Sequence, residues 1–174
     1  VHKGRKPVQP SGRVVRTFYE RASELLQHPL LTFDEPARAV IAEAFGEAMR
    51  RERYTCYACA VMPDHVHILI RKHKHQVEEM AENLIATSRA KLIKTGHRDP
   101  DHPTWVGGTP WSMYLDHPDE VRRTITYIER NPIKIGLPAQ RWDFVRPYDN
   151  WPLHPGHSPN SPYAKRLREL GRYP

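Results

Sequence analysis

Apolar residues recur at every third or fourth position along residues 35–52, the spacing that places side chains on one face of a helix. They include Val40, Ile41, Phe45 and Met49. At the start of this segment, Thr32 and Glu35 have the spacing of a capping box, in which two side chains satisfy the first free amides of a helix. We therefore predict an amphipathic helix over residues 35–52 that begins at this box.

The pattern changes after residue 53 to one typical of strands. Residues 54–62 and 65–71 are rich in apolar side chains, and the Pro63-Asp64 pair between them is a turn signal. This pattern predicts a tight β-hairpin. Along its second strand, alternation points Val66, Ile68 and Ile70 to one face and His65, His67, Leu69 and Arg71 to the other. One face then joins the core, while the other carries two imidazoles.

Helical spacing returns twice further along the chain. It predicts a helix over residues 77–94 and another from Pro118 to Asn131. Asp116 or His117 is the expected N-cap of the later helix. Its expected end is Asn131, because a residue that precedes a proline avoids helical dihedrals.

Shorter elements complete the expected order. Residues 15–27 suit a short helix and residues 111–115 a short strand. The order helix, strand, strand, helix, strand, helix predicts an α+β fold, an antiparallel sheet with helices on one face, followed by a C-terminal helix. Such a sandwich normally has a strand before its first long helix, and only residues 14–18 offer a poor substitute. The first strand is therefore either missing or formed by that segment.

The length of 174 residues fits one domain with flanking segments. Composition predicts a basic N-terminal arm (residues 1–30), a folded domain (residues 31–152) and a basic, proline-rich tail (residues 153–174). No apolar run approaches the roughly 18–20 residues that span a bilayer, and the start of the sequence does not resemble a secretory signal. We expect a cytoplasmic protein.

Basic residues exceed acidic ones, which gives a formal net charge of +7. This excess favours a polyanionic partner, most simply nucleic acid. An anionic membrane surface is the alternative, but no segment pairs a basic face with a strongly apolar one. We therefore expect nucleic acid rather than membrane as the partner.

Cys56 and Cys59 form a CxxC pair, a spacing that also occurs in zinc and redox sites. On a strand, an offset of three residues would point the two side chains to opposite faces. The sequence also has no second CxxC pair to complete a tetrahedral zinc site. We interpret the pair as two buried, inert thiols.

His65 and His67 are two residues apart on a predicted strand, so both imidazoles lie on one face and can converge on a cation. With eleven histidines in the chain, a chance pair of surface histidines is the simpler alternative. His73 and His75 form a second pair of this kind, which we assign to contact with solvent or phosphate. The first pair differs because it interrupts an apolar run, where imidazoles are costly to desolvate unless they are ligated.

The last predicted helix carries a second candidate group. Its core stripe consists of Val121, Ile125 and Ile128. Tyr127 and Asn131 lie one turn apart beside this stripe, and Glu120 extends the same row. Taken singly, Tyr127 is an ordinary edge-of-core aromatic and Asn131 a helix-end polar residue. Together they offer a phenol and an amide oxygen on one face.

These residues carry a resemblance to a known family. The segments VMPDHVHILI and YIERNPIKIGL together resemble the HUH single-tyrosine transposases, in particular their REP-associated branch. WSMYLDHPDEVRRTI and RWDFVRPYDNW also match, so the resemblance covers about residues 33–152. It implies a ferredoxin-like sandwich with a sheet of four or five antiparallel strands. It also implies that His65 and His67 are metal ligands, Tyr127 the nucleophile and Asn131 a third ligand.

The resemblance further implies an enzyme of DNA transposition and recombination. Such an enzyme cleaves and rejoins single-stranded, hairpin-flanked DNA through a 5′-phosphotyrosine intermediate. The implied ligands suit Mg²⁺ or Mn²⁺ better than zinc, and Glu120 is the candidate general base. A domesticated or truncated protein that binds hairpin DNA without cutting it is the alternative. A cupin-like metal oxidoreductase is disfavoured, because the further ligands of that class are absent from a strand context.

Several exposed side chains are candidate DNA contacts. Phosphates would be bound by basic residues and bases would stack on an aromatic ring. The candidates are Arg71, Lys72, Lys74, Arg89, Lys91, Arg122, Arg123 and, for stacking, Trp111. We expect a nucleoid-associated monomer or homodimer, and the sequence leaves open whether Tyr127 serves its own chain or a partner.

Overall fold

The computed structural model describes residues 31–105, 111–115, 117–150, 166 and 168–170. The chain divides into two compact units, residues 1–32 and 33–174, and every element below belongs to the second. The expected helix at residues 15–27 and the substitute strand at residues 14–18 lie outside the described residues. None of the described helices is long and apolar enough to cross a membrane.

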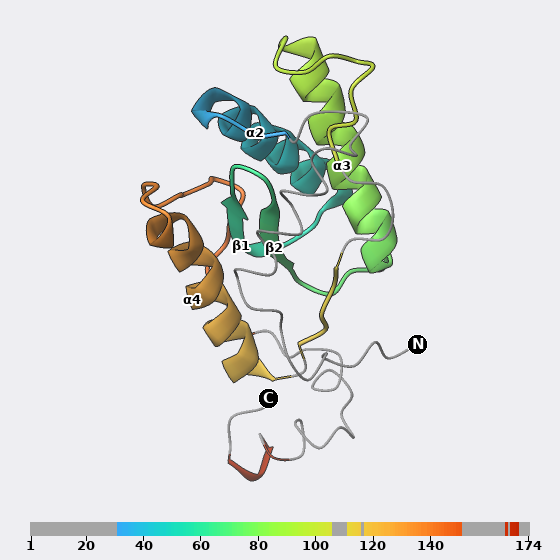
Figure 1. Cartoon of the computed structure of the whole chain (residues 1–174). Coiled ribbons are helices and arrows are strands. Elements are labelled where there is room, and N and C mark those ends of the chain that lie inside the picture. The colour runs from blue at the N-terminus through green and yellow to red at the C-terminus, as the bar shows by residue number, and fades with distance from the viewer. Residues whose placement is uncertain (1–30, 106–110, 116, 151–165, 167, 171–174) are drawn as a thin grey trace. The chain divides into compact units, whose positions relative to one another are not determined.

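Three helices and two strands form the described fold (Figure 1). Their order is α2 (Glu35–Glu52), β1 (Cys56–Val61), β2 (Val66–Ile70), α3 (Val77–Lys94) and α4 (Pro118–Lys134). The strands form a two-stranded antiparallel sheet. The predicted α+β class is therefore confirmed, as are the predicted bounds of α2 and α3.

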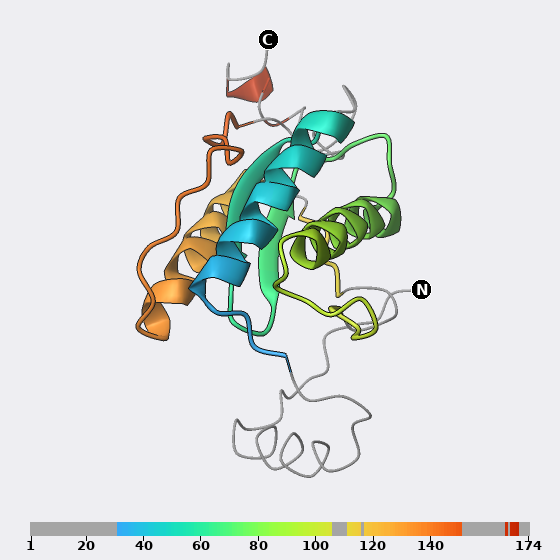
Figure 2. The ribbon, with the colours of Figure 1, turned by 90° about the horizontal axis from the view of Figure 1, so that it is seen from above.

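The two faces of the hairpin pack against different helices. On one face, Val61, Val66 and Ile68 join a core cluster with residues of α2 and α3. On the other, Ala58 and Ala60 pack with Ile128 of α4. Figures 1 and 2 show the hairpin between α4 on one side and the pair of α2 and α3 on the other. Because His67 pairs directly with Ala60 across the sheet, it points to the α4 face. It thus points away from the face of Val66 and Ile68, as predicted.

The outer edge of β1 is covered by the segment that follows α4. The side-chain amide of Gln140 donates to the carbonyl of Val61 and accepts from its N–H, both at 2.8 Å. Further along, Val145 forms a parallel bridge with Cys56. Within residues 138–150 the chain is otherwise irregular, and it satisfies edge groups of the sheet that would otherwise need water.

A β-bulge at the start of β1 changes which face each cysteine occupies. Cys56 lies opposite Ile70 but Ala58 lies opposite Leu69, so Tyr57 is the extra residue. Cys56 and Cys59 consequently join the same core cluster, and the prediction of opposite faces is wrong. Both thiols are free and buried, as predicted. Burial raises the pKa of Cys56 to about 12, which keeps this thiol protonated and unreactive.

The structure corrects the ends of two helices. The N-cap of α2 is Asp34, whose side chain accepts from the N–H of Ala37 at 2.9 Å, and not the Thr32 box. At α4 the predicted cap His117 accepts from the N–H of Asp119. However, α4 continues through Pro132 to Lys134, so the predicted end at Asn131 is wrong. Proline removes one helical hydrogen bond, and buried packing of its ring outweighs that loss.

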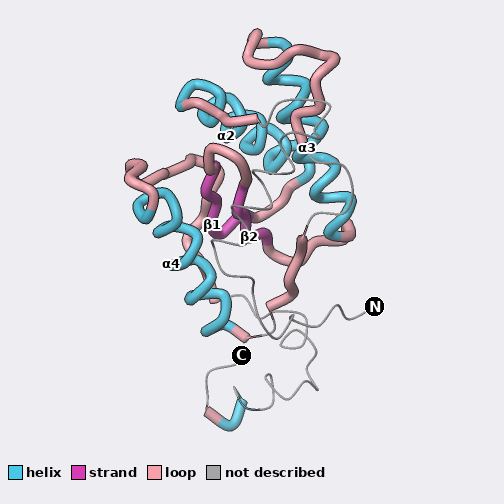
Figure 3. Tube along the Cα trace, in the orientation of Figure 1, coloured by secondary structure: helices cyan, strands magenta, loops and turns pink. Residues whose placement is uncertain are grey.

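Residues 111–115 form no strand, contrary to the prediction, and are drawn as a loop in Figure 3. Trp111 is 85% exposed, so this segment has little of the burial that a half-buried strand needs. The described residues do not form the sheet of four or five strands that the resemblance implies. The described residues contain two strands.

Candidate active site

The first histidine pair lies where β2 begins, facing α4. The hairpin turn is closed by a hydrogen bond from the N–H of Met62 to the carbonyl of His65, at 2.8 Å. The Nε2 atoms of His65 and His67 lie 3.1 Å apart. On the far side of the first ring, Nδ1 of His65 lies 2.6 Å from the Asp64 carboxylate. If this nitrogen carries the proton, the Nε2 lone pair of His65 faces His67.

The separation of the two Nε2 atoms fits a shared divalent cation. Two ligands at neighbouring positions of an octahedral ion with bonds of about 2.1 Å lie about 3.0 Å apart. In a tetrahedral zinc site with similar bonds the separation is about 3.4 Å. A carboxylate behind a ligating histidine, as Asp64 is placed here, orients many metal-bound imidazoles. The observed 3.1 Å is therefore compatible with a divalent cation shared by the two imidazoles.

A third ligand must be of another residue type. Among the described residues, no group of three or more His, Cys, Asp or Glu side chains could hold a metal ion. Asn131 is 8% exposed, and its Nδ2 atom is buried without a hydrogen-bond partner. Its amide can present oxygen instead of nitrogen by a simple turn. No described hydrogen bond joins Asn131 to either imidazole, so its part in the site stays a prediction.

Tyr127, on α4, lies next to the histidine pair. Its ring centroid lies 5.6 Å from that of His67, edge to face, and half of the residue is exposed. The core contacts of Ile128 with Ala58 and Ala60 hold this part of α4 against the sheet. The phenol ring therefore lies beside the His67 imidazole.

Lys134 joins this group, and the sequence analysis missed it. Its Nζ atom lies 4.6 Å from the centre of the Tyr127 ring. The residue was overlooked because the helix was expected to end at Asn131. The spacing of seven residues from Tyr127, two helical turns, is the signal that could have found it.

The environment of His67 favours its neutral form. Burial lowers the pKa of His67, and the nearby His65 and Lys134 lower it further. A metal ligand must be the neutral imidazole, so a lowered pKa keeps His67 able to bind a cation at more acidic pH.

The candidate base Glu120 lies in the first turn of α4, seven residues before Tyr127. This spacing of two helical turns equals the one that separates Tyr127 from Lys134. The role of Glu120 as a general base stays a prediction.

Several predicted DNA contacts are already engaged in other interactions. Arg71 pairs with Asp149 at 3.5 Å and Lys91 with Glu43 at 2.6 Å. Arg122 pairs with Asp119 at 2.6 Å, while Arg89 donates to the carbonyl of Pro100. Among the predicted DNA contacts, the exposed cations for which no ion pair is described are Lys72, Lys74 and Arg123. Trp111 is exposed, as stacking on a base requires.

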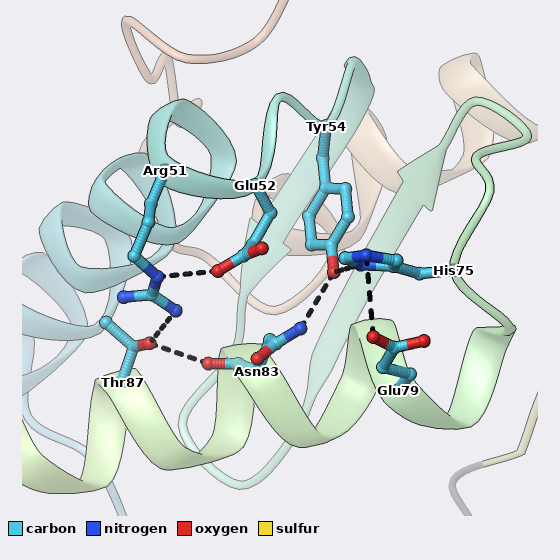
Figure 4. A network of polar contacts seen from close by, with 7 residues as sticks. All are labelled: Arg51, Glu52, Tyr54, His75, Glu79, Asn83 and Thr87. Atoms are coloured by element: carbon cyan, nitrogen blue, oxygen red, sulfur yellow. Dashed lines mark hydrogen bonds and ion pairs between the residues drawn. The ribbon is translucent and has the colours of Figure 1, made fainter.

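His75 of the second histidine pair belongs to a different network, which Figure 4 shows. The Tyr54 hydroxyl lies 2.8 Å from Nδ1 of His75 and accepts from the Asn83 amide at 2.9 Å. Nε2 of His75 lies 3.4 Å from the Glu79 carboxylate. The backbone N–H of His75 donates to Nδ1 of His73. Assigning His75 to solvent or phosphate was therefore wrong, because both of its ring nitrogens face protein groups.

Comparison with protein-family models matches residues 30–129 to the family described as transposase, IS200-like. The match covers more than half of the chain and contains His65, His67 and Tyr127, so the protein belongs to the IS200-like transposase family. This places it among DNA-binding enzymes that cleave DNA during transposition. No curated protein matches the chain, and no solved structure does.

Proposed function

We propose that this protein is a metal-dependent endonuclease and strand transferase for single-stranded DNA, with Tyr127 as its nucleophile. The observation that carries the proposal is the approach of the Tyr127 ring to His67, 5.6 Å between centroids, beside two facing Nε2 atoms. A nucleophile next to a cation site is the arrangement that phosphodiester cleavage requires.

The cleavage step exchanges one ester for another. The Tyr127 oxygen forms a bond to phosphorus, and the bond between phosphorus and the 3′-oxygen of the preceding nucleotide breaks. The phenolic proton passes to solvent, and the departing oxygen takes up a proton to become a 3′-hydroxyl. The product is a 5′-phosphotyrosine that conserves the ester bond, so a second 3′-hydroxyl can reverse the step and join the strand to new DNA.

His65 and His67 would hold Mg²⁺ or Mn²⁺, with Asn131 as the third ligand. When bound, such an ion neutralises charge on the phosphate and stabilises the transition state. Asp64 holds the ring of His65 through Nδ1. His67 is fixed by its strand, and its surroundings lower its pKa and so favour the neutral imidazole.

The substrate proposed is single-stranded DNA next to a hairpin, as in the REP-associated branch. Half of Tyr127 is exposed, so an extended strand can reach its hydroxyl without opening the fold. The exposed cations Lys72 and Lys74 follow β2, and Arg123 lies one turn before Tyr127 on α4. These residues are the candidate phosphate contacts of the proposed complex. Because His67 and Tyr127 meet within one chain, we propose that each chain cleaves with its own tyrosine.

The test is formation of a covalent protein–DNA adduct. The full chain is incubated with a 5′-extended hairpin DNA and Mn²⁺, and adducts are counted on a denaturing SDS gel. Tyr127→Phe should abolish the adduct and leave DNA binding nearly unchanged, whereas Tyr114→Phe, an equally conservative change at another exposed tyrosine, should leave both intact. Adducts in the Tyr127→Phe protein would show that another residue is the nucleophile. Binding without any wild-type adduct would favour the non-cutting alternative.

A further inference from the structure

Lys134 owes its position to the last turn of α4. This turn is closed by hydrogen bonds from the N–H of Leu137 to the carbonyl of Pro132, at 2.9 Å, and from the N–H of Gly136 to that of Ile133, at 3.1 Å. Gly136 adopts a positive φ of 77°, a conformation that costs glycine little. The helix end is therefore well defined, and Lys134 is its last residue.

The spacing along α4 places Lys134 on the same face as Tyr127. Seven residues at about 100° each amount to almost two full turns. The flexible side chain returns its ammonium group to 4.6 Å from the centre of the phenol ring. The same charge acts on His67, whose pKa it helps to lower. Lys134 thus lies close to both the nucleophile and a proposed metal ligand.

Lys134 has no described acidic partner, unlike Lys91 and Arg122. Lys91 is held by Glu43 and Glu47, and Arg122 by Asp119. The described contact of the Lys134 ammonium group is the face of the Tyr127 ring. Such a cation–π contact at an exposed site is weak. A phosphate oxygen is a stronger partner for an ammonium group, because the hydrogen bond is then charge-assisted.

We propose that Lys134 is a catalytic residue whose ammonium group binds a non-bridging oxygen of the phosphate that Tyr127 attacks. This role rests on the proposed function. As the phenolic oxygen bonds to phosphorus and the 3′-oxygen leaves, negative charge on the phosphate region is stabilised by a cation already in place. Lys134 gives up its contact with the ring for one with the phosphate, and it transfers no proton.

The first test measures the single-turnover rate of adduct formation at saturating DNA. Lys134→Met keeps most of the side-chain length but removes the charge, and should slow the adduct about 10- to 100-fold. Lys134→Arg should recover most of the rate. The matched control is Lys94→Met, a change at the exposed last residue of α3, which should react like wild type. All three variants should melt like wild type.

A second test measures the phosphate contact through DNA binding, in a protein that cannot form the adduct. In a Tyr127→Phe background, DNA affinity is measured over a range of salt concentrations. Adding Lys134→Met should reduce the slope of log affinity against log salt by about 0.7, the value for one lost phosphate contact on a single strand. Adding Lys94→Met should not change the slope.

Two results would overturn the role of Lys134 while leaving the proposed function intact. One is an adduct rate for Lys134→Met within about twofold of Lys94→Met, since one lost charge-assisted contact is worth more. The other is Lys134→Arg as slow as Lys134→Met, which would indicate a shape requirement rather than a charge. A wild-type protein that forms no adduct would overturn the proposed function, and the role of Lys134 with it.

Discussion

The chain contains two histidine pairs of the same form, and the fold gives them different surroundings. His65 and His67 lie at the start of β2 with their Nε2 atoms 3.1 Å apart, facing one another beside Tyr127. His73 and His75 lie in the loop before α3, where Nδ1 of His75 faces the Tyr54 hydroxyl at 2.8 Å. The Nε2 atoms of the first pair face one another, whereas the ring nitrogens of His75 in the second pair contact protein groups and hold a loop.

The difference comes from the backbone beneath each pair. A strand projects residues i and i+2 in parallel, so two imidazoles can share one ligand. A loop imposes no such direction, and there His75 bonds instead to Tyr54 and Glu79 (Figure 4). The motif alone therefore does not predict a metal site, and the strand gives the first pair the geometry that the proposed site needs.

The largest expected difference between the pairs is in DNA cleavage. His67→Ala should lower the rate of adduct formation about 10³-fold, because a lost metal ligand removes several kcal/mol of transition-state stabilisation. His75→Ala should leave the rate nearly unchanged in protein that remains folded. Removal of the metal with EDTA should reproduce the first effect in wild type. Equal losses in both variants would break the distinction between the pairs.

Folding stability should depend more on the second histidine pair than on the first. Tyr54→Phe removes a buried hydroxyl that joins Asn83 and His75, and should lower the free energy of unfolding by about 1–3 kcal/mol. Tyr114→Phe, at an exposed tyrosine, should change it by less than about 0.5 kcal/mol. Urea denaturation measures both. A Tyr54→Phe protein as stable as the control would contradict a structural role for the second pair.

The smallest expected effect is on the pH dependence of folding stability. Burial lowers the pKa of His73, and neighbouring His75 and Lys74 lower it further, while Glu79 and Glu52 act in the opposite sense. Between its lowered pKa and the ordinary value of 6.5, the unfolded state binds more protons, so stability falls as the pH drops through this interval. His73→Gln should lose less stability than wild type between pH 7 and pH 5, measured by thermal melting. A steeper loss in the variant would reverse the sign and refute the assignment.

Local patterns predicted the elements whose signals are strong. The apolar spacing of α2 and α3 gave their bounds, and alternation along β2 gave the direction of His67. These patterns reflect the local geometry of helices and strands, so the folded protein keeps the elements that they predict. The family resemblance then joined β2 to the helix that carries Tyr127.

Features set by tertiary packing were not predicted. The bulge at Tyr57 reverses the face of Cys56, and nothing in the local sequence marks it. α4 continues through Pro132 because that ring is buried, and this added turn brings Lys134 to Tyr127. The bond between Tyr54 and His75 joins residues far apart in the sequence. Each of these depends on contacts that periodicity does not encode.

The most direct test of the central claim is Mn²⁺ binding in the absence of DNA, measured by electron paramagnetic resonance. Wild type and the double variant His73→Ala/His75→Ala should bind one Mn²⁺ with similar affinity. The double variant His65→Ala/His67→Ala should lose this binding while remaining folded. Retention of the ion by the His65/His67 variant, or its loss in the folded His73/His75 variant, would contradict the account.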